Sequence, residues 1–118
     1  MESVTDYVLL LDIYGELLSK TQREVLDMRC NADLSLSEIA EEMGGVTRQS
    51  VSNSMKKGEQ RLEELERALG FAERLRRLSA QLEEAKRLCA CLSEGLDGER
   101  RAQLDELSAL LRAMESEL

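Results

Sequence analysis

The chain has 118 residues, of which 34% are charged, and a net charge of −8, with no histidine, proline or tryptophan. A chain of this length fits one domain, or one domain with an appendage. The lack of histidine excludes the commonest catalytic base, and no run approaches the ~20 apolar residues of a membrane span.

The composition favours helices throughout. Leucine, glutamate, arginine and alanine dominate, and no alternating run of β-branched and aromatic residues marks a strand, so we expect an all-α protein. Apolar residues recur along one side of a first helix at Val4, Val8, Leu11 and Leu18. We expect Gly15 to end this helix or to lie in its last turn.

A second helix follows, over residues 19–30. Ser19 with Gln22 and Thr21 with Glu24 both have the spacing of a capping box. Val25, Leu26 and Cys30 are expected to face inward from this helix.

The polar stretch NADLS leads into two further helices. Ser35 and Glu38 form another capping box, and Leu36, Ile39, Ala40 and Met43 share one face of a short helix that Gly44-Gly45 ends. Thr47 caps the next helix, which runs through Val51, Met55, Leu62, Leu65 and Leu69. Gly58 is a weak point inside it, costing about 1 kcal/mol relative to alanine.

The pattern changes after Gly70. Leucine-rich seams alternate spacings of three and four residues, first at Leu75, Leu78, Leu82, Ala85, Cys89 and Leu92, and then at Leu104, Leu107, Leu111, Met114 and Leu118. The intervening SEGLDGE predicts a loop and hence an antiparallel helical hairpin. We therefore expect two domains, residues 1–70 and residues 71–118, the hairpin serving as a dimerisation or partner-docking element.

The cysteines indicate a reducing compartment. Cys30, Cys89 and Cys91 are odd in number and lack a disulfide framework, and the Cys-Ala-Cys pair lacks further ligands for zinc. We expect no metal, no cofactor and no catalytic residue. The acidic N-terminus lacks the basic start of a signal peptide, so a cytoplasmic protein is expected.

Residues 35–53 predict a helix-turn-helix unit. Ile39-Ala40 supplies the apolar and small pair, Gly44 the turn, and Val46 and Val51 the packing of the second helix. The second glycine, Gly45, makes the turn one residue longer than usual, and a two-glycine turn either absorbs this insertion or tilts the second helix. The core should contain three or four helices, as in winged-helix-like and homeodomain-like proteins.

The second helix of this unit has the side chains of a nucleic-acid contact. The N-terminal residues of a recognition helix lie at base edges, where arginine and glutamine can pair with guanine and adenine. Residues 47–61 hold four basic residues and one acidic residue in a chain of net charge −8. The candidate nucleic-acid-binding residues are Thr47, Arg48, Gln49, Ser50, Asn53, Lys56, Lys57 and Arg61. A solvated, well-capped helix start explains the same residues without a ligand.

Four stretches within residues 8–71, LDIYGELLSKTQRE, DLSLSEIAEE, VTRQSV and KKGEQRLEELE, resemble the YlxM family. These are small bacterial proteins whose helix-turn-helix is similar to region 4 of sigma factors. The resemblance implies nucleic-acid binding and a role in the signal recognition particle (SRP) pathway, with SRP RNA or the SRP GTPase as partner. The recognition segment corresponds to residues 47–50, with Lys56 and Lys57 behind it. The segment after Phe71 lies outside the shared stretches.

Three functions remain open. The first is a nucleic-acid-binding regulator of SRP assembly or GTP hydrolysis, and Arg74, Arg76 and Arg77 either extend its contact surface or form a solvated helix face. The second is a DNA-binding transcription regulator that forms a homodimer through the first helix or the hairpin. The third is a protein-interaction adaptor without nucleic acid. An enzyme is not expected, because no phosphate-binding glycine loop and no nucleophile beside a base is present.

Overall fold

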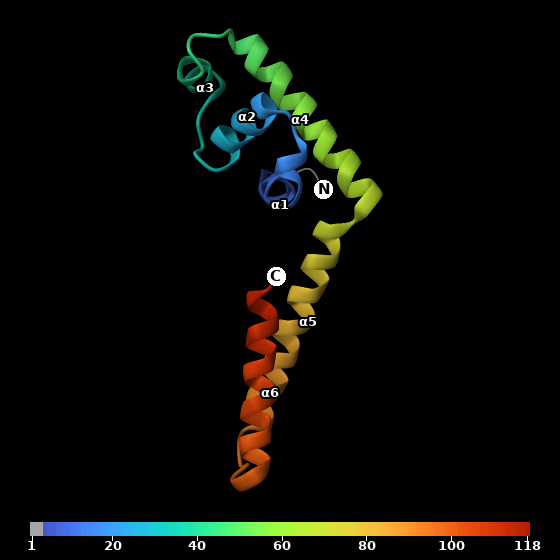
Figure 1. The fold of residues 1–118 in the computed structure, drawn as a ribbon. Helices are drawn as coiled ribbons and strands as arrows, with labels where there is room; N and C mark the ends of the chain where they lie inside the picture. Colours follow the sequence, from blue (N-terminus) through green and yellow to red (C-terminus); the bar gives the residue numbers. More distant parts are fainter. Residues whose placement is uncertain (1–3) are drawn as a thin grey trace. The chain divides into compact units, whose positions relative to one another are not determined.

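In a computed structural model, the protein is described for the backbone of residues 4–118 and the side chains of residues 7–118. Residues 1–3 and the predicted inward position of the Val4 side chain lie outside this description. The described chain forms six α-helices and one 3-10 helix (Figure 1): α1 Val4–Tyr14, η1 Gly15–Leu17, α2 Lys20–Cys30, α3 Leu36–Glu42, α4 Arg48–Leu69, α5 Phe71–Leu92 and α6 Gly98–Ser116.

The all-α prediction is confirmed, because no strand occurs between residues 4 and 118. The helix-turn-helix therefore has no β wing in this part of the chain. Within the same residues, no helix combines the length and the apolar character that crossing a membrane requires. The internal contacts divide the chain into a first unit that ends at Ala72 and a second from Glu73 to Leu118.

Side-chain hydrogen bonds fix where the helices of the first unit begin. Ser19 accepts from the backbone N–H of Gln22 and Ser35 from that of Glu38, and in each case the residue three positions later bonds back to the cap. Both are complete capping boxes, so of the two boxes considered near residue 20 the one at Ser19 is formed. Val25 and Leu26 are buried, and Cys30 is half-buried.

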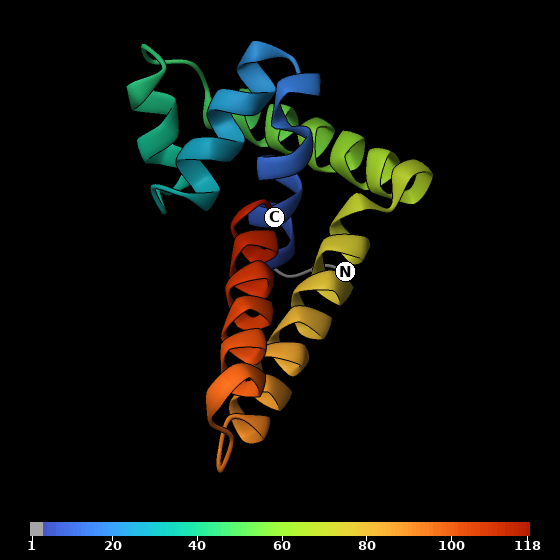
Figure 2. The ribbon, with the colours of Figure 1, turned by 60° about the horizontal axis from the view of Figure 1, so that its bottom comes forward.

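The core of the first unit lies along α4, which packs against α1, α2 and α3 (Figure 2). One cluster joins Leu10, Leu26 and Leu62, all fully buried, with Tyr14. A second cluster joins Val25 of α2, Ile39 and Ala40 of α3, and Val51 of α4. The second cluster holds the start of α4 against the helix that precedes it.

Gly58 lies where α4 crosses α2. The residue is buried, and a Cβ atom built on it would stand 2.7 Å from Cδ1 of Leu26 and 3.4 Å from Cβ of Gln22. Real Cβ atoms essentially never make a contact that short, so an alanine here would require the Leu26 side chain to shift. The predicted propensity cost of Gly58 is therefore accompanied by a close packing of α4 on α2 that the sequence analysis did not include.

A buried hydrogen-bond network holds the junction between α4 and α5 against α1. The Tyr14 hydroxyl donates to the Glu66 carboxylate at 2.7 Å and accepts from the Phe71 backbone N–H at 3.2 Å. Glu66 also accepts from the Ala72 backbone N–H at 3.0 Å. The first N–H groups of α5 are thus satisfied by side chains from α1 and α4, and the buried Glu66 has donors for its charge.

The second unit is the predicted antiparallel hairpin of α5 and α6 (Figure 1). The Lys86 ammonium bridges to Glu115 at 2.8 Å across the two helices. Leu82, Cys89 and Leu104 are the buried apolar residues between Glu73 and Leu118. Much of the predicted seam is not buried, since the following members are exposed: Leu78, Leu92, Leu107, Met114 and Leu118.

Candidate nucleic-acid interface

The turn between α3 and α4 is a glycine-based helix stop. The Gly45 N–H donates to the Ala40 carbonyl at 3.0 Å, and the Gly44 N–H donates to the Glu41 carbonyl at 3.1 Å. This pair of bonds is a Schellman motif, which needs a left-handed residue after the helix cap. Gly44 supplies it with φ +87°, and Gly45 has the same φ. The second glycine is therefore part of the stop and donates one of its two hydrogen bonds.

Packing of the helix-turn-helix follows the predicted pattern with one exception. Ile39 and Val51 are 0% and 1% exposed, and Ala40 is buried beside them, which confirms the predicted contact between the two helices. Met43 packs against this cluster as a half-buried residue. Val46, expected to pack inward, is 40% exposed, because it follows two glycines in the turn and precedes the cap residue of α4.

All eight predicted contact residues are exposed. Thr47 is the N-cap of α4, and its hydroxyl accepts from the Ser50 N–H at 3.0 Å. The Gln49 amide donates to the Asn53 side-chain oxygen at 3.0 Å, one helical turn further along. Five of the candidates therefore lie together at the cap and in the first two turns of α4: Thr47, Arg48, Gln49, Ser50 and Asn53.

A hollow lies where α3 and α4 begin. It is lined by Leu36 of α3 and by Arg48, Gln49 and Ser52 of α4. Ser52 was absent from the sequence-based prediction, because its place beside Leu36 depends on how the two helices pack. Arg48 thus lies on the side of α4 that borders α3, next to both helix starts.

The remaining basic residues lie further along α4. Arg61 comes thirteen residues after Arg48, about 20 Å along the helix axis at 1.5 Å per residue. The Arg61 guanidinium lies 3.7 Å from the Glu64 carboxylate. Lys56 and Lys57 occupy the turns between. The eight residues therefore form a compact group at the helix start, a lysine pair behind it, and Arg61 one turn beyond Lys57.

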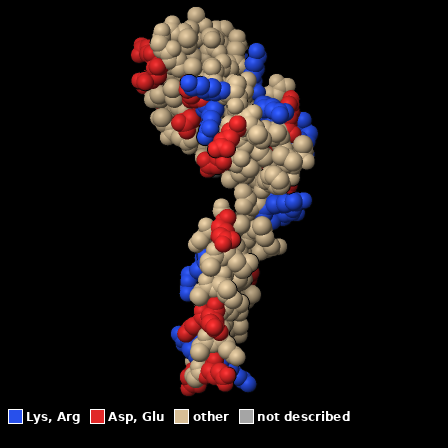
Figure 3. Space-filling view, in the orientation of Figure 1, with Lys and Arg blue, Asp and Glu red and all other residues tan. Residues whose placement is uncertain are grey.

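The charges over α3 and over α4 differ (Figure 3). Acidic side chains gather over α3, whereas basic side chains, with acidic ones among them, follow the outer edge of α4. The acidic residues of α3 are Glu38, Glu41 and Glu42. Hydrogen bonds from the Ser35 backbone N–H and the Ser35 side chain lower the pKa of Glu38, so this carboxylate stays charged at the start of α3.

No acidic residue occupies the first turn of α4 or of α2, whereas α3, α5 and α6 have Glu38, Glu73 and Glu99 in theirs. A helix start carries a partial positive charge from its unpaired N–H groups, which an acidic side chain or an external anion offsets. The start of α4 therefore leaves that place open to an anionic ligand.

Comparisons with known proteins agree with this arrangement. A family described as "Putative helix-turn-helix protein, YlxM / p13 like", named UPF0122, matches residues 1–93. The match reaches the end of α5, so the similarity to the family extends beyond the four stretches within residues 8–71.

Curated relatives bear the same family name. A UPF0122 protein of Symbiobacterium thermophilum is 39% identical over 99% of each chain. Another, of Halalkalibacterium halodurans, is 36% identical over 91% of this chain and 89% of its own. One from Acetivibrio thermocellus is 45% identical, with 60% of each chain covered.

Proposed function

Because the chain belongs to the UPF0122 family of YlxM-like helix-turn-helix proteins, we propose that it is a regulatory protein that binds a nucleic acid through the start of α4. One observation carries the proposal: the first turns of α4 present exposed polar and basic side chains, with no acid in the first turn. The family and the all-α fold favour a binding protein over an enzyme.

Each residue at the start of α4 suits a different contact. Arg48 has the planar fork that pairs with guanine or with phosphate. Gln49 keeps its carbonyl oxygen and one N–H for adenine, since its other N–H is directed to Asn53. The exposed hydroxyl of Ser50 suits phosphate oxygens. Thr47 is a cap, so its primary role is to hold the helix start in place.

The lysine pair supplies sequence-independent attraction. Lys56 and Lys57 are exposed two turns behind Arg48 and suit the phosphate backbone. With Arg48 they give about three phosphate-directed cations, so the slope of log K against log salt should be about −2 to −3. The acidic remainder of the chain repels polyanions, which confines binding to α4.

At the finer level, we propose RNA of the SRP as the nucleic acid, with the SRP GTPase as a protein partner. The resemblance of four stretches within residues 8–71 to the YlxM family supports this choice. DNA is the alternative ligand, and the recognition-helix arrangement of α3 and α4 favours it.

A titration with matched arginine variants tests the proposal. The full chain is titrated with a bacterial SRP RNA and with a mixed-sequence DNA duplex at 50 and 200 mM salt. Arg48→Ala should weaken binding to the preferred polymer about tenfold, which corresponds to ~1.4 kcal/mol. Arg67→Ala removes the same charge from the exposed last turn of α4 and should change binding little.

The outcomes separate the candidate functions. Tighter, salt-sensitive, Arg48-dependent binding to the RNA supports the particle-linked role, and the same behaviour with the duplex supports the transcription regulator. Equal loss in both variants would show net charge to be the cause and would remove the helix start as the site. Absence of binding to either polymer would reject the nucleic-acid function and leave the protein-interaction adaptor.

A further inference from the structure

The second unit leaves an unusual amount of apolar surface in solvent. Between Glu73 and Leu118, seven leucine and methionine residues are 46–61% exposed: Leu78, Leu88, Leu92, Leu107, Leu110, Met114 and Leu118. Only Leu82, Cys89 and Leu104 are buried apolar residues in this range. Two helices with so small a core have little to hold them together, because most helix stability in proteins comes from packing.

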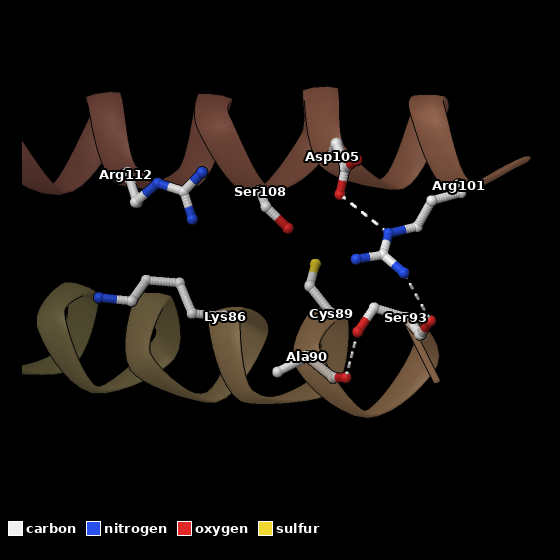
Figure 4. A pocket seen from close by; sticks show the side chains of 8 residues that line it. All are labelled: Lys86, Cys89, Ala90, Ser93, Arg101, Asp105, Ser108 and Arg112. Carbon is white, nitrogen blue, oxygen red and sulfur yellow. Dashed lines mark hydrogen bonds and ion pairs between the residues drawn. The ribbon is translucent and has the colours of Figure 1, made fainter. Parts of the chain in front are cut away.

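The hairpin has two unlike faces. One is a polar groove between α5 and α6 (Figure 4), lined mainly by polar residues. Across this groove, Arg101 of α6 donates to the carbonyl of Ser93, the residue after α5, at 3.2 Å. Within α6, Arg101 also pairs with Asp105 at 3.3 Å. Ser93, Arg101 and Asp105 therefore mark one side of the hairpin.

The exposed apolar residues lie on the other side. On α5, Leu78, Ala85 and Leu92 recur every seven residues, so they form a stripe along the helix. On a helical wheel with 100° per residue, the buried Leu82 and Cys89 mark the direction that α5 buries. The stripe lies on one side of this direction, and the groove residue Ser93 lies on the other.

The same relation holds on α6. Leu107 and Met114 are also seven residues apart, and they lie on the opposite side of the buried Leu104 from Arg101 and Asp105. Because the groove joins the polar sides of the two helices, their apolar sides also share a face. We call the set Leu78, Ala85, Leu92, Leu107, Met114 and Leu118 the apolar face.

The apolar surface is large for a monomer. The five exposed leucine and methionine residues of the apolar face, at about half exposure, present roughly 450 Å² of apolar area, within the ~300–600 Å² of the largest patch on a typical monomer. Leu88 and Leu110 flank the face on the helical wheel and bring the apolar area to roughly 600 Å², against the ~800 Å² of total surface per partner in a stable complex. The helical wheel places Arg74 and Arg100 at the two ends of the face, so its centre carries no charge.

We propose that a second copy of this chain covers the apolar face, and that the two hairpins form a four-helix bundle. A two-fold interface requires one patch that matches itself, which an uncharged stripe of leucines on both helices provides. The seven-residue repeat is the spacing with which helices of such bundles interlock. Pairing converts a two-helix hairpin with three buried apolar residues into a bundle with a shared core. None of these residues belongs to the proposed nucleic-acid contact.

Sedimentation equilibrium of the full chain, without nucleic acid, tests the proposal. We expect a species of twice the 13.3 kDa chain mass at about 10–100 μM. Leu107→Lys/Met114→Lys places two charges in the centre of the face and should shift the protein to monomer. Leu17→Lys, at a leucine of η1 that is 59% exposed, should leave the dimer unchanged.

A milder variant tests the proposal even where the double-lysine variant does not fold. Leu107→Ala should keep the helical circular dichroism signal and raise the dimer dissociation constant at least tenfold. A wild-type monomer at 100 μM would overturn the proposal. A dimer that persists in the helical double-lysine variant would place the interface elsewhere and overturn it equally. Because no nucleic acid is present, either result leaves the nucleic-acid proposal to its own titration.

Discussion

Gly58 sets how closely α4 approaches α2, and a single methyl group tests this. Gly58→Ala gains about 1 kcal/mol of helix propensity. The added Cβ, however, lies 2.7 Å from Cδ1 of Leu26, a fully buried side chain that would have to shift. Overpacking of this kind costs about 1–3 kcal/mol. We expect a net loss of about 1 kcal/mol in the free energy of unfolding, measured by urea denaturation.

The control for Gly58→Ala is Gln60→Ala, two residues further along α4 and exposed. It changes helix propensity without a packing clash, so its stability should stay within about 0.5 kcal/mol of the wild type. If Gly58→Ala is as stable as Gln60→Ala, the packing of α4 on α2 accommodates the added methyl group, and Gly58 does not set how closely the two helices approach.

We expect Tyr14 to make the first unit less stable as the pH rises into the alkaline range. Burial and the hydrogen bond to Glu66 raise the pKa of Tyr14 above its ordinary 10.0. The fold therefore favours the protonated hydroxyl, and this contribution is complete below pH 10 and is lost as pH rises through the raised pKa. The wild type should lose more stability between pH 9 and pH 11 than Tyr14→Phe does.

Urea midpoints of both proteins at several pH values measure this difference. Tyr14→Phe should be less stable than the wild type at pH 8, by about 1–2 kcal/mol, because Glu66 loses a donor and the Phe71 N–H loses its acceptor. Parallel pH profiles for the two proteins would mean that another group controls the alkaline transition.

At the scale of elements, the turn between α3 and α4 depends on a left-handed residue. Gly44 has φ +87° and closes the Schellman motif that ends α3. In Gly44→Ala, the Cβ meets no neighbour but the backbone is strained, at a cost of about 1–2 kcal/mol. Urea denaturation should show this loss.

A matched substitution at Ala32, which is exposed in the polar stretch before α3, separates turn geometry from a general loop effect. Ala32→Gly should cost less than Gly44→Ala, because the structure records positive φ in this stretch only at Asp33. Equal losses in the two variants would remove the special role of Gly44.

The elements that the sequence predicts well are those with local causes. Ser19 and Ser35 cap their helices through residues three positions away, so the caps and the exposed start of α4 follow from short stretches. The packing of Gly58 and the role of Glu66 were missed because their partners, Leu26 and Tyr14, are 32 and 52 residues away. Ser52 was missed for the same reason, since it lies beside Leu36 of another helix.

The whole molecule combines an acidic body with one basic helix edge and one apolar face. Acidic side chains predominate over the chain as a whole, while residues 47–61 carry four basic residues and one acidic residue. Under the proposed function, this division restricts polyanion binding to α4. The two surfaces use different residues, so they can be altered separately.

If both proposals hold, dimerisation raises affinity for nucleic acids that engage two copies of α4. The second contact then becomes intramolecular, which strengthens binding without any new contact. Leu107→Lys/Met114→Lys should therefore weaken binding to a long polymer of the preferred type by at least tenfold. On an oligonucleotide that accommodates one helix-turn-helix, the variant and the wild type should bind alike. Fluorescence anisotropy with the long and the short ligand measures both values. An equal loss on the two ligands would mean that the substitutions disturb the folding of the contact surface, and unchanged binding to both would mean that each recognition helix binds alone.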